Sequence, residues 1–139
     1  MRLKKQIAIL ALGAGFAGCT PQPATNLIED NMEFAQQQLR FAFDEIDYAI
    51  VNESPESRAK REKNGWGELT NPRNSEPDGT LNLVPSKDWT SGFFPGELWF
   101  LYEYTQNNFW KKKAQQHTDI LEKEKMNGST HDMGFKVYC

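Results

Sequence analysis

Two short blocks of this chain hold the residue types that chemistry on a polar ligand requires. Residues 88–99 read DWTSGFFPGELW and place an indole, Trp89, near glycines that let the backbone turn or pack closely. Residues 130–135 read THDMGF and join an imidazole, a carboxylate and a phenyl ring in His131, Asp132 and Phe135. A carboxylate can hold a sugar hydroxyl or move a proton, and an aromatic ring suits the apolar C–H face of a sugar.

The same residues also admit purely structural interpretations. We expect three of the aromatic side chains in the first block to lie in the core: Phe93, Phe94 and Trp99. Trp89 could equally contact a ligand or pack internally on its chemistry alone. In the second block, Asp132 could cap a following helix, with His131 as a surface residue.

Helices are predicted to position these blocks. Residues 26–51 form one long amphipathic helix in this interpretation, because apolar residues recur at alternating spacings of four and three: Ile28, Met32, Ala35, Leu39, Ala42, Ile46 and Ala49. Helices are also predicted over 95–104 and 108–125, the latter capped by Asn107 or Asn108 and carrying a partly buried, structural His117. Residues 52–91 are predicted to be a long loop, with a short strand at 81–84 after the Asp78–Gly79 turn.

The N-terminus has the layout of an export signal. A basic start, an apolar run and the small residues before Cys19 resemble a bacterial lipoprotein signal, so residues 1–18 are expected to be removed and Cys19 to carry a lipid. Residues 19–25 would tether the lipid to a domain over residues 26–139. We therefore expect an exported protein that is anchored to a membrane only through this lipid, in the periplasm or outer membrane of a Gram-negative bacterium.

Composition excludes several other functions. Removing Arg2, Lys4 and Lys5 with the signal changes the net charge from −3 to −6, which argues against nucleic-acid binding. The GxGxxG spelling at 13–18 lies inside the removed segment and does not indicate a dinucleotide site. There is no HExxH or CxxC motif, and Cys139 is left without a disulfide partner.

Together the two blocks resemble the unsaturated glucuronyl hydrolase family, glycoside hydrolase family 88. The resemblance runs from Asn71-Pro72-Arg73 through both blocks, including residues 98–105 (LWFLYEYT). It implies an all-α fold in which this chain is the N-terminal part of an (α/α)6 barrel. It also implies that the enzyme hydrates the C4=C5 double bond of a terminal unsaturated uronic acid on a lyase-generated oligosaccharide, without a metal or cofactor.

The resemblance further implies roles for individual residues. Asp132 resembles the first of two essential aspartates, and His131, Phe135 and Trp89 match residues that line the subsite for the unsaturated ring. The second aspartate of the family lies tens of residues further on, so we expect this chain to be truncated and inactive by itself. Two alternatives remain: an unsaturated rhamnogalacturonyl hydrolase with the same barrel, and a non-catalytic glycan-binding surface lipoprotein. No oligomeric state follows from these residues.

Overall fold

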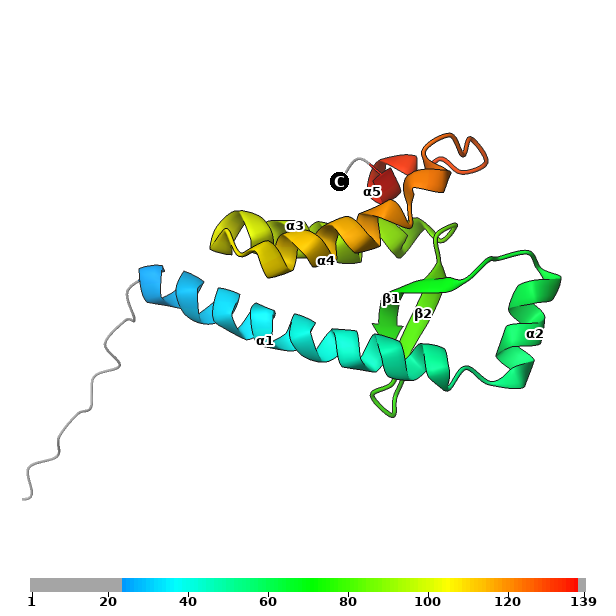
Figure 1. Cartoon of the computed structure of the whole chain (residues 1–139), viewed down its shortest axis with the longest axis horizontal. Coiled ribbons are helices and arrows are strands. Elements are labelled where there is room, and N and C mark those ends of the chain that lie inside the picture. Colours follow the sequence, from blue (N-terminus) through cyan, green and yellow to red (C-terminus); the bar gives the residue numbers. More distant parts are fainter. Residues whose placement is uncertain (1–23, 138–139) are drawn as a thin grey trace, which may run out of the picture.

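The computed structural model describes residues 24–137, and within them the chain is mostly helical (Figure 1). This confirms the helical fold class. The lipidation site Cys19 and nearly all of the predicted leader and tether lie outside the described residues. No helix among residues 24–137 is both long and apolar enough to cross a bilayer.

Long helices form the body of the molecule. Helix α1 (Ala24–Val51) lies along the antiparallel pair α3 (Phe93–Thr105) and α4 (Asn108–Asp119) in Figure 1. Their facing sides form the core, which is built from side chains that all three contribute: Phe43, Ile46, Phe94, Leu98, Leu101, Trp110 and Ala114. The apolar stripe predicted on α1 packs toward this core from Met32 to Ala49, whereas Ile28 is exposed. Periodic burial therefore accounts for all three helices.

The segment 52–91 is not the long loop that was expected. It contains helix α2 (Pro55–Lys63) and an antiparallel hairpin of β1 (Leu69–Ser75) and β2 (Leu81–Pro85). Pro55 occupies the first turn of α2, where a missing N–H costs nothing, after the Ser54 cap. Gly79 adopts a φ of 91° in the hairpin turn, as the Asp-Gly pair indicated. The predicted strand at 81–84 is thus confirmed, and it pairs with a strand that was not predicted.

The predicted helix over 108–125 is too long. Asn107 caps α4 as expected, its Oδ1 accepting from the Phe109 N–H at 2.9 Å, but the helix ends at Asp119. A 3-10 turn, η2 (Glu122–Glu124), follows and directs Glu124 into the interior. There the Glu124 carboxylate accepts a hydrogen bond of 2.7 Å from Ser86. A buried carboxylate needs a hydrogen-bond partner, and the turn after Asp119 is what brings Glu124 to Ser86. We take this as the physical reason that the helix ends early.

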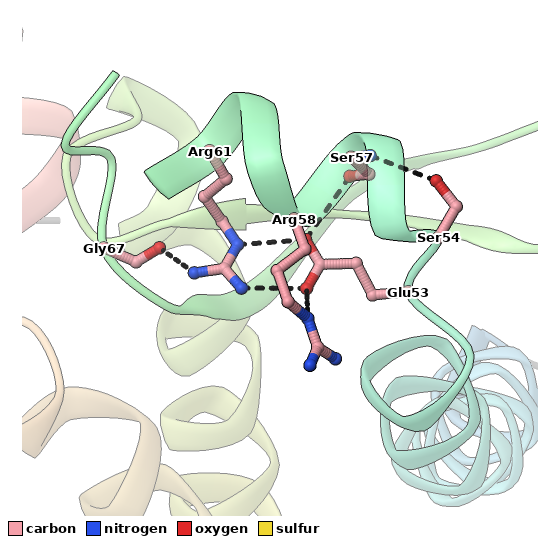
Figure 2. A network of polar contacts seen from close by, with 6 residues as sticks. All are labelled: Glu53, Ser54, Ser57, Arg58, Arg61 and Gly67. Atoms are coloured by element: carbon pink, nitrogen blue, oxygen red, sulfur yellow. Dashed lines mark hydrogen bonds and ion pairs between the residues drawn. The ribbon is translucent and has the colours of Figure 1, made fainter. Parts of the chain in front are cut away.

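A polar network ties α2 back to the end of α1 (Figure 2). The Arg61 guanidinium donates to both oxygens of Glu53, at 2.9 and 2.8 Å, and to the Gly67 carbonyl at 2.7 Å. The hydrogen bond from Arg61 is the main reason that the pKa of Glu53 lies below its usual value. Bidentate pairs of this kind specify geometry strongly, so the connection before α2 and the turn after it are both fixed relative to α2.

His117 lies where α4 meets α1, α3 and the hairpin. Its ring stacks on Phe43 with centroids 5.9 Å apart and meets Phe94 edge-on at 4.9 Å. Its Nδ1 lies 2.6 Å from Oδ1 of the buried Asn71, which fits a neutral imidazole that donates from Nδ1. Burial lowers the pKa of His117 from 6.5 to about 4, with a smaller contribution from Lys113. The structural role predicted for this residue agrees with these contacts.

This lowered pKa predicts a pH-dependent stability. The unfolded chain protonates His117 near pH 6.5 and the folded chain only near 4, so the free energy of unfolding is highest above pH 6.5 and falls as the pH drops toward 4. Solvent screening limits the loss to on the order of 1–2 kcal/mol. Urea unfolding at pH 7 and pH 4.5 should show a smaller difference for His117→Gln than for the unmodified chain. Equal differences would contradict the assignment.

Candidate functional site

Trp89 begins a 3-10 turn, η1 (Trp89–Gly92), between the hairpin and α3. Asp88 caps this turn: its Oδ1 accepts from the Thr90 N–H at 2.9 Å and from the Thr90 hydroxyl at 2.6 Å. The other Asp88 oxygen pairs with Arg73 of β1 at 3.2 Å. Trp89 is therefore carried by a turn whose own polar groups are satisfied, and its backbone is well fixed.

Three aromatic rings meet at this turn, and we call Trp89, Phe93 and Phe135 the aromatic cluster. The centroids of Trp89 and Phe93 are 5.7 Å apart, and Phe135 lies 6.2 Å from each of them, all in edge-to-face geometry. The three side chains remain 41%, 39% and 51% exposed, respectively. Rings that pack on one another yet stay open to solvent form a rigid apolar surface suited to a sugar face.

Phe93 was expected in the core, and that prediction is wrong. Phe94 takes the core position instead, and Phe93 joins the aromatic cluster on the surface. The four-residue spacing of Trp89 and Phe93 places them on one side of a continuous turn and helix, which is the one sequence signal for their contact. Trp99 is partly buried, with its indole N–H donating to the Thr118 hydroxyl at 3.0 Å.

Asp132 and His131 lie immediately before helix α5 (Met133–Val137), which carries Phe135. The carboxylate of Asp132 lies 2.8 Å from His131 Nδ1 and is partly buried, whereas the His131 side chain is largely exposed. The Asp132 carbonyl accepts from the Phe135 N–H at 3.2 Å. Because Phe135 contacts Trp89, Asp132 stands one helical turn from the aromatic cluster. The structure thus brings both sequence blocks to the same place; the catalytic and binding roles assigned to their residues stay predictions.

A close backbone approach holds α5 against η1. A Cβ built on Gly92 would lie 2.3 Å from the Lys136 carbonyl oxygen, so only glycine fits at this position. The Lys136 side chain is buried, with 2% of its surface exposed, and its ammonium donates to the Lys87 carbonyl at 2.8 Å. This anchoring of α5 fixes Phe135 and Asp132 relative to Trp89.

Buried polar side chains form a hydrogen-bond network next to this contact between α5 and η1. Asn71 donates to the Ser91 carbonyl at 2.7 Å, and the Ser91 hydroxyl donates to the Ser86 carbonyl at 2.9 Å. Burial raises the pKa of Glu124, but hydrogen bonds from Ser86 and Asn127, together with nearby lysine charges, outweigh it and leave this pKa below its usual value. Every buried side-chain polar atom in the described part of the chain has a hydrogen-bond partner. Such satisfied networks specify one arrangement.

An open cavity of about 880 Å³ adjoins the aromatic cluster, between the hairpin and α3. Phe93 lines it together with Arg73, Asn74 and Glu97. Its mixture of rings, an amide and charged groups suits a polar ligand. Within residues 24–137, no group of three His, Cys, Asp or Glu side chains is placed to hold a metal ion.

Comparison with known proteins supports the sequence-based resemblance. The chain is 62% identical over 59 residues to an unsaturated glucuronyl hydrolase of Formosa agariphila, a match that covers 42% of this chain and 15% of the relative. It is 33% identical over 63 residues to an unsaturated chondroitin disaccharide hydrolase of Streptococcus pneumoniae, again covering 42% of this chain and 15% of that protein. No family model matches the chain.

A solved structure, that of an unsaturated glucuronyl hydrolase specific for heparin, aligns with a TM-score of 0.49 and 32% identity. That alignment covers 77% of this chain and 25% of the other. The curated matches show that the chain is similar to unsaturated glucuronyl hydrolases, which confirms the resemblance drawn from the two sequence blocks. The matches span only about 15% of the length of the curated relatives.

Proposed function

We propose that this chain contributes one wall of the substrate site in a hydrolase that removes terminal unsaturated uronic acids from lyase-generated oligosaccharides. The observation that carries the proposal is that Phe135, one helical turn after Asp132, packs against Trp89, in a chain with 62% identity to an unsaturated glucuronyl hydrolase over 59 residues. An unsaturated uronate is flat, anionic and rimmed with hydroxyl groups. An exposed indole beside a carboxylate and an imidazole matches each of those properties.

The proposed reaction is hydration of the C4=C5 double bond. A carboxylic acid gives a proton to C4, and water adds its oxygen to C5 and returns a proton to a carboxylate. The C5 hemiketal then opens to a ketone by breaking its bond to the ring oxygen, which takes up the hydroxyl proton and leaves a hemiacetal at C1. Collapse of this hemiacetal to an aldehyde breaks the glycosidic bond, and the remaining saccharide leaves with the hemiacetal proton. This route needs a carboxyl group that can donate and accept a proton near neutral pH.

Each residue of the site has a part in this proposal. Trp89 and Phe135 form the apolar floor under the unsaturated ring. His131 binds the substrate carboxylate or a hydroxyl from its exposed position. Asp132 holds the ring and assists the proton-donating acid, and its 2.8 Å contact with His131 couples the two polar groups.

The proposal is tested by following the ultraviolet absorbance of the substrate double bond. The product of the complete gene should consume unsaturated glucuronyl disaccharides, and a pectin-derived unsaturated disaccharide should react more slowly. Faster reaction of the pectin-derived substrate would assign the protein to the rhamnogalacturonyl group instead. Binding of the disaccharide without any loss of absorbance would indicate a glycan-binding protein rather than an enzyme.

We also propose that the protein is exported and lipidated at Cys19, on the basis of the signal-like residues 1–18. A lipid chain gives membrane affinity that a hydrophilic domain does not have by itself. In cell fractionation, the unmodified protein should sediment with membranes, and Cys19→Ser should be released or remain as an uncut precursor. Equal membrane association and equal processing in the two proteins would refute lipidation.

A further inference from the structure

A second open groove, of about 820 Å³, lies between α2 and the hairpin, apart from the aromatic cluster. The end of α1, one side of α2 and both strands line it. Its notable side chains are Lys60, Trp66, Arg73, Lys87 and Asp88. None of the roles proposed above uses this groove.

Trp66 is presented to the groove by a well-fixed turn. Its backbone N–H donates to the Arg61 carbonyl at 3.1 Å. The carbonyls of the two neighbouring glycines are also bonded: Gly65 accepts from the Lys87 ammonium at 3.0 Å, and Gly67 from the Arg61 guanidinium at 2.7 Å. Figure 2 shows the Arg61 guanidinium between the Gly67 carbonyl and the Glu53 carboxylate. The indole is nevertheless 43% exposed. An exposed ring on a rigid backbone binds a sugar face with little loss of entropy.

The groove is locally cationic on a chain whose formal net charge is −3. Four basic groups and three carboxylates line it, which leaves one net positive charge. Arg61 pairs with Glu53 and Arg73 with Asp88, and Glu76 is the third carboxylate. Lys60 and Lys87 form no ion pair with any carboxylate among residues 24–137, and Lys60 sits 6.0 Å from the Trp66 ring centroid. A net positive lining with an ammonium group near an indole favours an anionic saccharide.

The groove borders the candidate site. Arg73 lines both this groove and the cavity beside Phe93, and its partner Asp88 directly precedes Trp89. An oligosaccharide whose terminal ring lies on Trp89 can therefore pass the Arg73–Asp88 pair toward Trp66. We propose that the α2–hairpin groove binds the anionic sugar units that follow the unsaturated uronate, the part released by the reaction. This inference rests on the proposed function.

Chain length of the substrate provides the test. In the complete gene product, Trp66→Ala should lower kcat/KM about tenfold on an unsaturated tetrasaccharide that carries uronate or sulfate groups, mainly through a higher KM. The unsaturated disaccharide has only one unit after the uronate and can contact at most the edge of the groove at Arg73 and Asp88, so its kcat/KM should fall much less. Lys60→Ala should act in the same direction, whereas Lys63→Ala on the same helix, outside the groove, should have no effect. Thermal melting of each variant checks that the fold is kept.

Two results would overturn the inference: equal losses on the two substrates, or unchanged tetrasaccharide kinetics in Trp66→Ala. If the unmodified protein hydrolyses neither substrate, the proposed function fails, and the groove is then judged by calorimetric binding of a saturated anionic tetrasaccharide. Binding that Trp66→Ala weakens would keep the groove as an anionic-saccharide site. Binding that is undetectable, or insensitive to Trp66→Ala, would refute it.

Discussion

Replacing Asp132 by Asn is expected to lower kcat/KM for unsaturated disaccharides by about 10²-fold or more, because the amide can neither carry the negative charge nor exchange the proton of the carboxyl group. The substitution keeps the size and shape of the side chain. The thermal midpoint should therefore stay close to that of the unmodified protein, which separates lost chemistry from lost structure. The measurement is the rate at which the double-bond absorbance disappears in the complete gene product.

Asp119→Asn is the matched control for this change. Asp119 is an exposed carboxylate at the end of α4 that accepts a hydrogen bond of 2.7 Å from Gln115. It has no part in the proposed site. Asp119→Asn removes one negative charge, as Asp132→Asn does, so a general electrostatic effect would appear in both variants. Full activity in Asp132→Asn, or equal losses in the two variants, would remove Asp132 from the proposed site.

The second large effect is expected from Gly92→Ala. The new methyl group would lie 2.3 Å from the Lys136 carbonyl oxygen, which belongs to backbone and cannot swing away. Helix α5 must therefore move outward, carrying Phe135 and Asp132 away from Trp89. We expect the free energy of unfolding to fall by about 2 kcal/mol through overpacking. If these residues form the proposed site, activity should fall by about 10²-fold, because their geometry is displaced by the order of an ångström.

Gly96→Ala provides the contrast, since a Cβ on Gly96 meets nothing within 4 Å and the residue lies inside α3. This variant should be as stable as the unmodified protein, or more stable by up to about 1 kcal/mol, through better helix propensity. Urea unfolding and the absorbance assay, applied to Gly92→Ala alongside, check both expectations. If Gly92→Ala unfolds and reacts like the unmodified protein, the contact between α5 and η1 does not organise the site.

Local features of the sequence were enough to predict the helical framework. Burial on one side of a helix repeats every three to four residues, so the stripe on α1 and the buried pair Trp110 and Ala114 on α4 could be recognised without a structure. Capping by Asn107 and the Asp78–Gly79 turn are equally local, because each depends on a side chain and backbone groups within a few residues.

Between residues 52 and 91, the prolines and charges led to the prediction of a loop where the structure has a helix and a hairpin. Pro55 starts α2 rather than breaking a helix, and the pairing of β1 with β2 depends on hydrogen bonds between strands that no single segment reveals. The network of Glu53 and Arg61 joins residues eight positions apart, in a geometry that exists only after α2 has formed. Contacts of this kind are set by packing, which overrides local propensity.

By itself, the sequence indicated the two blocks that could carry chemistry, around Trp89 and around Asp132, and the periodic apolar faces of the long helices that must be buried. Only the tertiary structure decided that Phe93 leaves the core for the aromatic cluster and that Lys136 is buried under the turn that carries Trp89. The physical reason is that residue type and spacing specify which face of an element is apolar. Which partner a ring or an ammonium group contacts depends on how distant segments pack together in the folded chain.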